Sequence, residues 1–218
     1  MCGIAGVVAL REELEPVGLE PLARMAGALR HRGPEETGAY RDARAGLAHA
    51  RLSIIDLATG QQPLSNEDGS LWIAFNGEIF NYVELREELV SLGHRFRTRS
   101  DTEVILHAYE ARGQECVQDF NGQWALALWD SRRRRLFLSR DRLGVRPLYY
   151  TLVGNRFLFA LPAWGGQPAD NSATVQNERR ILHEAAIREP LVSRQVRHFY
   201  ARSGQRLAIL PMLRGCQY

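Results

Sequence analysis

The sequence contains no lysine. All 28 of its basic residues are arginine, and 25 acidic residues oppose them, which leaves a formal charge of +3. So small a positive excess gives no reason to expect a nucleic-acid partner. Long apolar runs are also missing, because the apolar run over residues 4–10 is far shorter than the roughly 20 residues of a membrane span. We therefore expect a protein that binds neither nucleic acid nor a membrane.

Cysteine is scarce and irregularly spaced. Its three copies, Cys2, Cys116 and Cys216, form no CxxC pair and no other metal-ligand spacing, so the sequence predicts no metal site. An odd number of cysteines without a signal peptide favours a reducing compartment, and we expect the protein in the cytoplasm. The 218 residues are enough for one substantial domain.

One cysteine directly follows the initiator methionine. Removal of Met1 would make Cys2 the first residue, and its thiol would lie beside a free α-amine, whose reference pKa is about 8. That amine can accept the thiol proton near neutral pH, so one residue would supply both a nucleophile and its base. The alternative, which Met-Cys alone would favour, is an inert small residue at the start of a strand.

The apolar patterns predict an α+β fold with mainly antiparallel sheets, because strands outnumber helices and several strands follow one another directly. We expect strands over residues 3–10, 46–55, 70–75, 123–129, 136–138, 148–153 and 156–160, and helices around residues 19–29, 81–92 and 100–109. The second and third helices each begin with a capping-box pattern, from Asn81 and from Ser100. The arginine run over residues 132–135 is typical of a tight turn between strands.

Three places in the chain allow a functional and a plain structural interpretation. Asn76-Gly77 falls between a predicted strand and a helix, where we expect a turn that presents an amide and backbone N–H groups, as an oxyanion hole requires. Arg51 on its predicted strand either points into solvent or pairs with a surface carboxylate, or else binds a carboxylate ligand. Asp101 in a first helical turn is explained by the helix dipole alone.

Six segments together resemble the glutaminase domain of glutamine-dependent asparagine synthetases, which are class II, N-terminal-nucleophile glutamine amidotransferases. They are Cys2-Gly3-Ile4 and residues 30–38 (RHRGP-x3-G), 49–56 (HARLSIID), 75–82 (FNGEIFNY), 100–106 (SDTEVIL) and 140–150 (RDRLGVRPLYY). The resemblance covers residues 2–160 in the order found in the family. It implies a four-layer αββα sandwich of two mainly antiparallel sheets, the N-terminal nucleophile hydrolase type.

The resemblance also implies catalytic roles. Cys2 would be the nucleophile and its own α-amine the base, while the Asn76 side chain and the Gly77 backbone N–H would form the oxyanion hole. The thiolate would attack the carboxamide of glutamine, ammonia would leave, and water would cleave the thioester to give glutamate.

Further residues would bind the amino-acid end of glutamine, by the same resemblance. Arg51 would bind the α-carboxylate, and Glu78 and Asp101 would hold the α-ammonium group. The residues whose main-chain groups would close the carboxylate side are Leu52, Ser53, Ile54 and Ile55.

The resemblance ends where the family continues into an ATP-using synthetase domain. Residues 161–218 contain no Ser-Gly-Gly-x-Asp-Ser loop for pyrophosphate, so we expect an unrecognised tail and a missing synthetase domain. The glutaminase step would need no cofactor, and ATP and magnesium would serve only that missing domain. We expect a glutaminase that supplies ammonia to a separate synthetase subunit or domain for ATP-dependent amidation of a carboxylate, aspartate in this family. A non-catalytic glutamine-binding or regulatory module, or a truncated fragment, are the alternatives.

Overall fold

Two antiparallel sheets form the centre of the molecule. We describe them from a computed structural model of residues 2–11, 16–31, 33–52, 60–146 and 148–161, with the backbone alone of residues 194–195 and 198–202. In this part of the chain, the first sheet has the order β10-β8-β9-β1-β3-β2, which is Arg194–Gln195, Tyr149–Val153, Arg156–Ala160, Gly3–Ala9, Ala45–Arg51 and Glu36–Arg41. The second has the order β11-β7-β6-β5-β4, which is His198–Arg202, Arg135–Arg140, Gly122–Asp130, Leu71–Ile79 and Leu64–Ser65.

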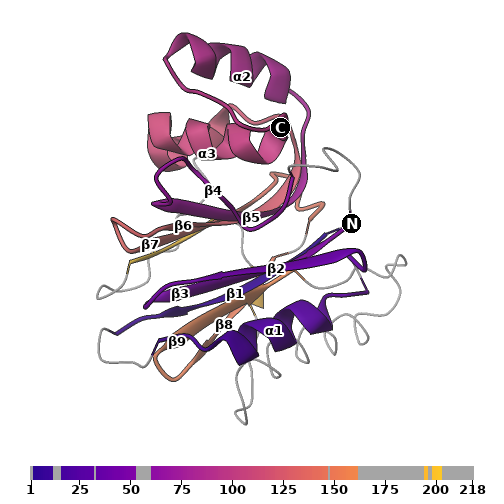
Figure 1. Ribbon diagram of the computed structural model, residues 1–218, viewed down its shortest axis with the longest axis vertical. Helices are drawn as coiled ribbons and strands as arrows, with labels where there is room; N and C mark the ends of the chain where they lie inside the picture. Colours follow the sequence, from indigo (N-terminus) through magenta and orange to yellow (C-terminus); the bar gives the residue numbers. More distant parts are fainter. Residues whose placement is uncertain are drawn as a thin grey trace.

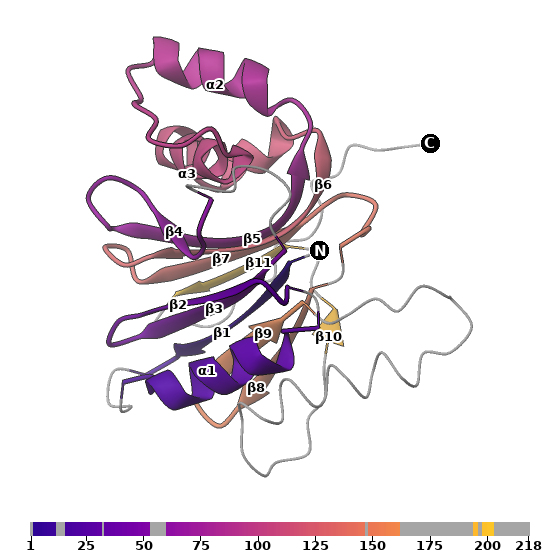
Figure 2. The ribbon, with the colours of Figure 1, turned by 45° about the vertical axis from the view of Figure 1, so that its right-hand side comes forward.

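Helices cover the two outer faces of the stacked sheets (Figures 1 and 2). Helix α1 (Leu19–Ala28) packs on the first sheet, and α3 (Asp101–Arg112) packs on the second. Helix α2 (Tyr82–Ser91) lies on α3, and the short 3-10 helix η1 (Gly113–Gln118) follows α3. The predicted four-layer αββα arrangement of two antiparallel sheets is confirmed. No helix in the described ranges is long and apolar enough to cross a membrane.

Strand alternation decides which side chains lie between the sheets. Along β5, Ala74 belongs to the core between the sheets, whereas Ile73 and Phe75 belong to the core under α2 and α3. Along β3, Leu47 faces the second sheet and Ala48 faces α1. Because side chains alternate with a period of two, the odd-numbered residues of β3 and the even-numbered residues of β5 point between the sheets.

Strand β5 is longer than predicted and passes straight through Asn76-Gly77. Asn76 pairs with Ala125 of β6 and Gly77 with Trp124, so the predicted turn at this dipeptide is wrong. A Cβ atom on Gly77 would lie 2.1 Å from the carbonyl oxygen of Gln123. The glycine therefore permits the close approach of the neighbouring strand, and cross-strand pairing overrides the local preference for a turn.

Asn81 stands at the N-cap position of α2 but does not cap the helix with its side chain. Its Nδ2 donates to the carbonyl of Asp119 at 2.9 Å, and its Oδ1 accepts from the backbone N–H of Asn121 at 2.9 Å. The predicted capping box is therefore replaced by a bridge to the loop before β6. Leu92, predicted on the buried face, is 60% exposed because α2 ends at Ser91.

The second predicted capping box is half formed. Ser100 caps α3 by accepting from the backbone N–H of Thr102 at 3.1 Å. Glu103 instead accepts from the backbone N–H groups of Arg97 at 2.8 Å and Thr98 at 2.6 Å, so it holds the loop before the helix. Further along the chain, the turn predicted over residues 132–135 connects β6 to β7, as expected.

Two backbone segments beyond residue 160 extend the sheets. Strand β10 pairs antiparallel with β8, and β11 pairs with β7 along five residues, from His198 opposite Ser139 to Arg202 opposite Arg135. The domain boundary at residue 160 stays a prediction, and these pairings are contacts between the two predicted regions.

A pair of glycine substitutions tests the packing of the first sheet. A Cβ on Gly6 would lie 2.3 Å from Cζ of Phe159 and 2.5 Å from the carbonyl oxygen of Gly46, whereas a Cβ on Gly27 of α1 meets nothing within 4 Å. Gly6→Ala should lower the free energy of unfolding by about 1–3 kcal/mol through overpacking. Gly27→Ala should raise it by up to about 1 kcal/mol, because alanine favours the helix. Urea unfolding measures both, and a neutral Gly6→Ala would contradict the described packing.

Candidate active site

The thiol of Cys2 lies against the backbone at the end of β3. Strands β1 and β3 pair with Gly3 opposite Ala50, which brings the residue before Gly3 next to the residues after Ala50. The backbone N–H of Leu52 donates to Cys2 Sγ at 3.5 Å, and Sγ donates to the carbonyl of Leu52 at 3.6 Å. The half-buried thiol is thus fixed directly beside Arg51.

Cys116, the other cysteine that the structure describes, is a poor nucleophile. It lies in η1 within the core under α3, and this burial, with the nearby charge of Asp119, raises its thiol pKa to about 12. A group with such a pKa stays protonated near neutral pH, and the thiolate is the reactive form. Cys216 lies outside the described residues.

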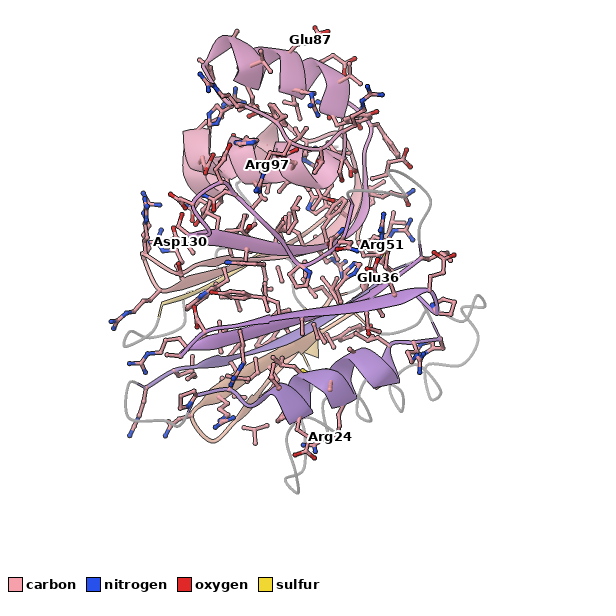
Figure 3. All side chains as sticks on the ribbon, in the orientation of Figure 1. Arg24, Glu36, Arg51, Glu87, Arg97 and Asp130 are labelled. Atoms are coloured by element: carbon pink, nitrogen blue, oxygen red, sulfur yellow. The ribbon has the colours of Figure 1, made fainter. Side chains whose placement is uncertain are left out.

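Arg51 is buried between the sheets as the last residue of β3, with 5% of its surface exposed. It does not point into solvent. Its Nη1 donates to Oε2 of Glu36, the residue opposite it on β2, at 3.3 Å. Figure 3 shows both side chains at the end of the sandwich where the second sheet approaches β2 and β3. The structure thus places a guanidinium group, paired with a carboxylate, on the residue before the one whose backbone holds the thiol.

Asn76 lies between the sheets with an unsatisfied amide. It is 4% exposed, and its Nδ2 has no hydrogen-bond partner among the described residues. Leaving a buried polar donor unpaired costs about 1–3 kcal/mol. A ligand oxygen placed there would recover the lost hydrogen bond, so the amide is available to stabilise an oxyanion.

The peptide group before Asn76 is held by His49, which the sequence prediction missed as a site residue. His49 is fully buried, and its Nε2 lies 3.3 Å from the carbonyl oxygen of Phe75. Burial lowers its pKa to about 4. The hydrogen bond that the ring donates to the carbonyl of Phe75 acts to raise this pKa, and the charge of Arg51 acts to lower it. The neutral ring therefore donates from Nε2, and this contact joins the C-terminal part of β3 to the middle of β5. The sequence did offer one signal for His49: it stands two residues before Arg51, so both side chains lie on the same face of the strand.

Gln62 binds the backbone N–H of Phe75, the residue whose carbonyl contacts His49. Gln62 was not predicted as a site residue either. Its Oε1 accepts from the backbone N–H of Phe75 at 2.6 Å, and its Nε2 donates to Thr102 Oγ1 at 3.3 Å. Gln62 therefore connects β5, next to Asn76, to the first turn of α3. No motif in the sequence marks this contact.

Two carboxylates gather where β5 ends. Asp101, 8% exposed at the start of α3, accepts from the backbone N–H of Ile79 at 3.1 Å through Oδ2. Burial raises the pKa of Asp101, and the charge of Glu78 raises it further, while hydrogen bonds from Ile79 and Thr102 act against the rise. Two neighbouring carboxylates favour a bound cation.

The structure thus brings together Cys2, Leu52 and Arg51 on the first sheet, and Asn76, Gly77, Glu78 and Asp101 at the end of β5. Strands β1 and β3 both contact β5, so the two groups belong to facing sheets. Ser53, Ile54 and Ile55, predicted to bind glutamine, lie outside the described residues. The assigned roles of all these residues stay predictions.

Comparison with known proteins identifies the family. A family model described as a glutamine amidotransferase domain matches residues 1–202. The chain is 44% identical over 161 residues to asparagine synthetase [glutamine-hydrolyzing] 2 of Bacillus subtilis, which covers 73% of this chain and 21% of the relative. It is 42% identical over 184 residues to asparagine synthetase [glutamine-hydrolyzing] of Sandersonia aurantiaca, covering 84% of this chain and 32% of the relative. The chain therefore spans about a fifth to a third of the length of these relatives.

A solved structure shares the fold. Glutamine phosphoribosylpyrophosphate amidotransferase from B. subtilis matches 97% of this chain and 50% of its own, with a TM-score of 0.68 and 19% sequence identity. At that identity the likeness concerns the fold alone. The resemblance inferred from the six sequence segments is confirmed by the sequence matches, and the chain belongs to the family of glutamine amidotransferase domains.

Proposed function

We propose that this chain hydrolyses glutamine to glutamate and ammonia, with Cys2 as the nucleophile. The observation that carries the proposal is the position of the Cys2 thiol, on the backbone of Leu52 and beside the buried Arg51. A cation next to a nucleophile suits a substrate that carries a carboxylate at one end and the reacting group at the other. Membership of the amidotransferase family supports the same reaction.

Glutamine would be bound at its amino-acid end by charges of both signs. Its α-carboxylate would pair with Arg51, as guanidinium geometry favours. The side chain of Glu36 is 38% exposed, so it can turn toward solvent when the substrate carboxylate takes its place. The α-ammonium group would lie at Glu78 and Asp101. Main-chain groups of residues 52–55 would close the carboxylate side.

The reaction follows from a processed N-terminus. The α-amine of Cys2 takes the proton of its own thiol, and the thiolate attacks the carboxamide carbon. The oxyanion that forms accepts hydrogen bonds from Asn76 Nδ2 and the Gly77 N–H. The terminal ammonium returns its proton to the leaving group, so the carbon–nitrogen bond breaks and ammonia departs. Water then attacks the thioester, releases glutamate and restores the thiol.

The ammonia would serve a second reaction outside these 218 residues. The printed names of the relatives describe glutamine-hydrolysing asparagine synthetases, and the chain covers only a fifth to a third of their length. The proposed acceptor of the ammonia is therefore a carboxylate, most simply that of aspartate. A synthetase domain or subunit that uses ATP and magnesium would amidate it. The glutaminase step itself needs no cofactor. We place the protein in the cytoplasm, as its few cysteines suggest.

Removal of the thiol tests the proposal. The protein with Met1 removed, verified by mass spectrometry of the intact chain, should release glutamate from glutamine, and Cys2→Ala should abolish this release because no other described thiol is reactive. Binding of glutamine by both proteins without turnover in either would instead favour a non-catalytic module. Activity that survives Cys2→Ala would overturn the mechanism.

The oxyanion hole has its own test. Asn76→Ala should lower kcat for glutamine hydrolysis about 100- to 1000-fold, the usual cost of one lost oxyanion donor. KM should change little, because the donor acts in the transition state. Asn76→Asp keeps the shape but replaces the donor with an acceptor, and it should be at least as damaging. If Asn76→Ala changed KM and left kcat unaltered, Asn76 would contribute only to binding the substrate in its ground state.

Asp101 gives the reaction a pH dependence. Since burial raises its pKa, Asp101 should lose its charge at a higher pH than an ordinary aspartate, and KM for glutamine should rise as the pH falls through that value. Asp101→Asn keeps an oxygen to accept from Ile79 but removes the charge. It should raise KM at neutral pH and flatten the acid rise, whereas an unchanged profile of KM against pH would limit Asp101 to joining the start of α3 to the backbone of Ile79.

A further inference from the structure

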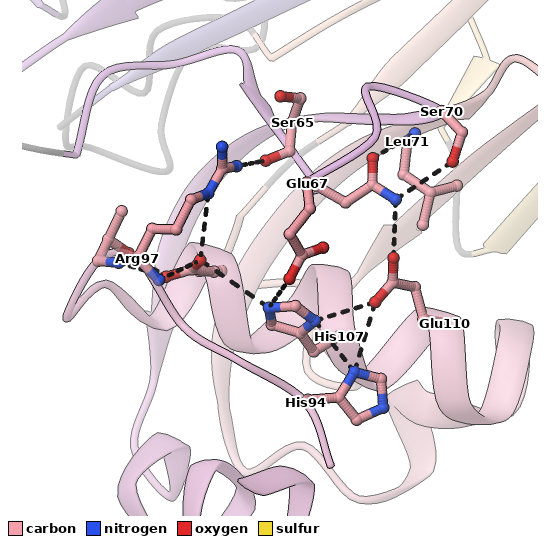
Figure 4. Close-up of polar contacts among 11 residues, drawn as sticks. Ser65, Glu67, Ser70, Leu71, His94, Arg97, His107 and Glu110 are labelled. Carbon is pink, nitrogen blue, oxygen red and sulfur yellow. Dashed lines mark hydrogen bonds and ion pairs between the residues drawn. The ribbon is translucent and has the colours of Figure 1, made fainter.

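A second cluster of polar side chains lies between α2 and α3, apart from the residues of the candidate active site (Figure 4). Nδ1 of His94 lies 3.1 Å from Nδ1 of His107 and 3.4 Å from Oε2 of Glu110, and His107 Nδ1 lies 2.9 Å from the same oxygen. His107 and Glu110 stand three residues apart on α3, and His94 comes from the loop after α2. Three atoms that can each donate a lone pair therefore meet at one point.

The triangle of these atoms has the size of a metal site. A tetrahedral zinc ion with bonds of about 2.0–2.1 Å holds its ligand atoms about 3.3–3.4 Å apart. The three measured separations, from 2.9 to 3.4 Å, lie close to this value. We propose that His94 Nδ1, His107 Nδ1 and Glu110 Oε2 bind a divalent transition-metal ion, with zinc as the favoured occupant. Two imidazoles and one carboxylate are a ligand set that zinc commonly takes.

The surrounding residues orient the ligands as metal sites require. Metal-bound histidines usually direct their other ring nitrogen at a carboxylate. Nε2 of His107 is buried without a hydrogen bond in the described structure, yet it faces Glu67 Oε1 at 3.6 Å and Glu103 Oε1 at 3.8 Å. Asn66 Nδ2 donates to Glu110 Oε1 at 2.7 Å, which leaves Oε2 directed at the histidines. The ring of Phe96 packs edge-on against His107 at 4.5 Å.

The charge around the cluster also favours a cation. Glu67, Glu103 and Glu110 approach His107, whereas Arg97, whose Nε lies 4.0 Å from Glu103, is the arginine that the described contacts place among them. A divalent ion would offset the excess of negative charge. It would also remove the need for two ring nitrogens 3.1 Å apart to share one proton.

The site would fasten two segments directly, the loop between α2 and α3 through His94 and helix α3 through His107 and Glu110. Glu67, in the turn between β4 and β5, would support the other ring nitrogen of His107. Asp101 begins the same helix six residues before His107, about 9 Å away along the axis. An ion at His107 would therefore hold the helix that carries Asp101. Three protein ligands leave the fourth position to water. This proposal does not depend on glutamine hydrolysis.

Metal binding can be measured without any activity assay. The parent should be the untagged Cys2→Ala protein, stripped with a chelator, so that the terminal thiol and amine cannot bind zinc together. Equilibrium dialysis against zinc chloride, followed by elemental analysis, should find one zinc ion per chain. His94→Gln and Glu110→Gln should each bind zinc at least ~10-fold more weakly, since even altered supporting residues cost about that much. Cobalt(II) in place of zinc should give the absorption of a tetrahedral nitrogen and oxygen site.

Two matched controls isolate the site. Glu87→Gln removes the same charge from the exposed face of α2, where Figure 3 shows its side chain directed outward, and His31→Gln removes an exposed histidine beyond α1. Both should bind zinc like the parent, and zinc should raise Tm in the parent and the controls but not in the ligand variants. The proposal is overturned if the stripped parent takes up no zinc, or if His94→Gln and the isosteric Glu110→Gln bind it as tightly as the parent does.

Discussion

The hydrogen bond between His49 and the carbonyl of Phe75 joins the two sheets at the end where the candidate site lies. His49 belongs to β3 and Phe75 to β5, so this contact connects facing strands of the two sheets. Arg51 follows His49 on the same strand face, and Asn76 follows Phe75. Because burial keeps the imidazole neutral, it can lie beside Arg51 without repelling it. The thiol of Cys2 is held by Leu52, the residue that follows Arg51.

Local patterns were sufficient for most of the fold but not for every boundary. Small and large apolar residues alternate along residues 122–130, and apolar residues recur with helical spacing after Ser100. Both patterns reflect burial, which stabilises the stacked sheets and the helix packed on them. Asn76-Gly77 misled the prediction because its turn preference is local, whereas pairing with β6 is not. Asn81 likewise has the residue type of a helix cap but finds a stronger partner in the loop before β6.

The candidate site divides in the same way. Residue types that match a motif, such as Cys2 and Asp101, could be selected from the sequence by resemblance. The residues that support these motif residues could not be selected in this way, because each supporting residue contacts partners that are distant in the chain. Gln62 reaches Phe75 and Thr102, and Glu36 reaches Arg51, only once β2, β5 and α3 are assembled. The supporting contacts are therefore visible only in the tertiary structure, while the residues of the motifs can be read from the sequence.

Helix α3 couples the candidate active site, at its first residue, to the polar cluster around His107. Its first residue, Asp101, is buried against the end of β5, where desolvation disfavours its charge. Glu103, one helical turn before His107, fixes the incoming loop through the backbone of Arg97 and Thr98. A carboxylate that is costly to bury stays in place only if its helix cannot shift. The polar contacts of His107 and Glu110, in the C-terminal half of α3, supply that restraint. Asp101 therefore stays at the position where, in the proposed function, it would hold the ammonium group of the substrate.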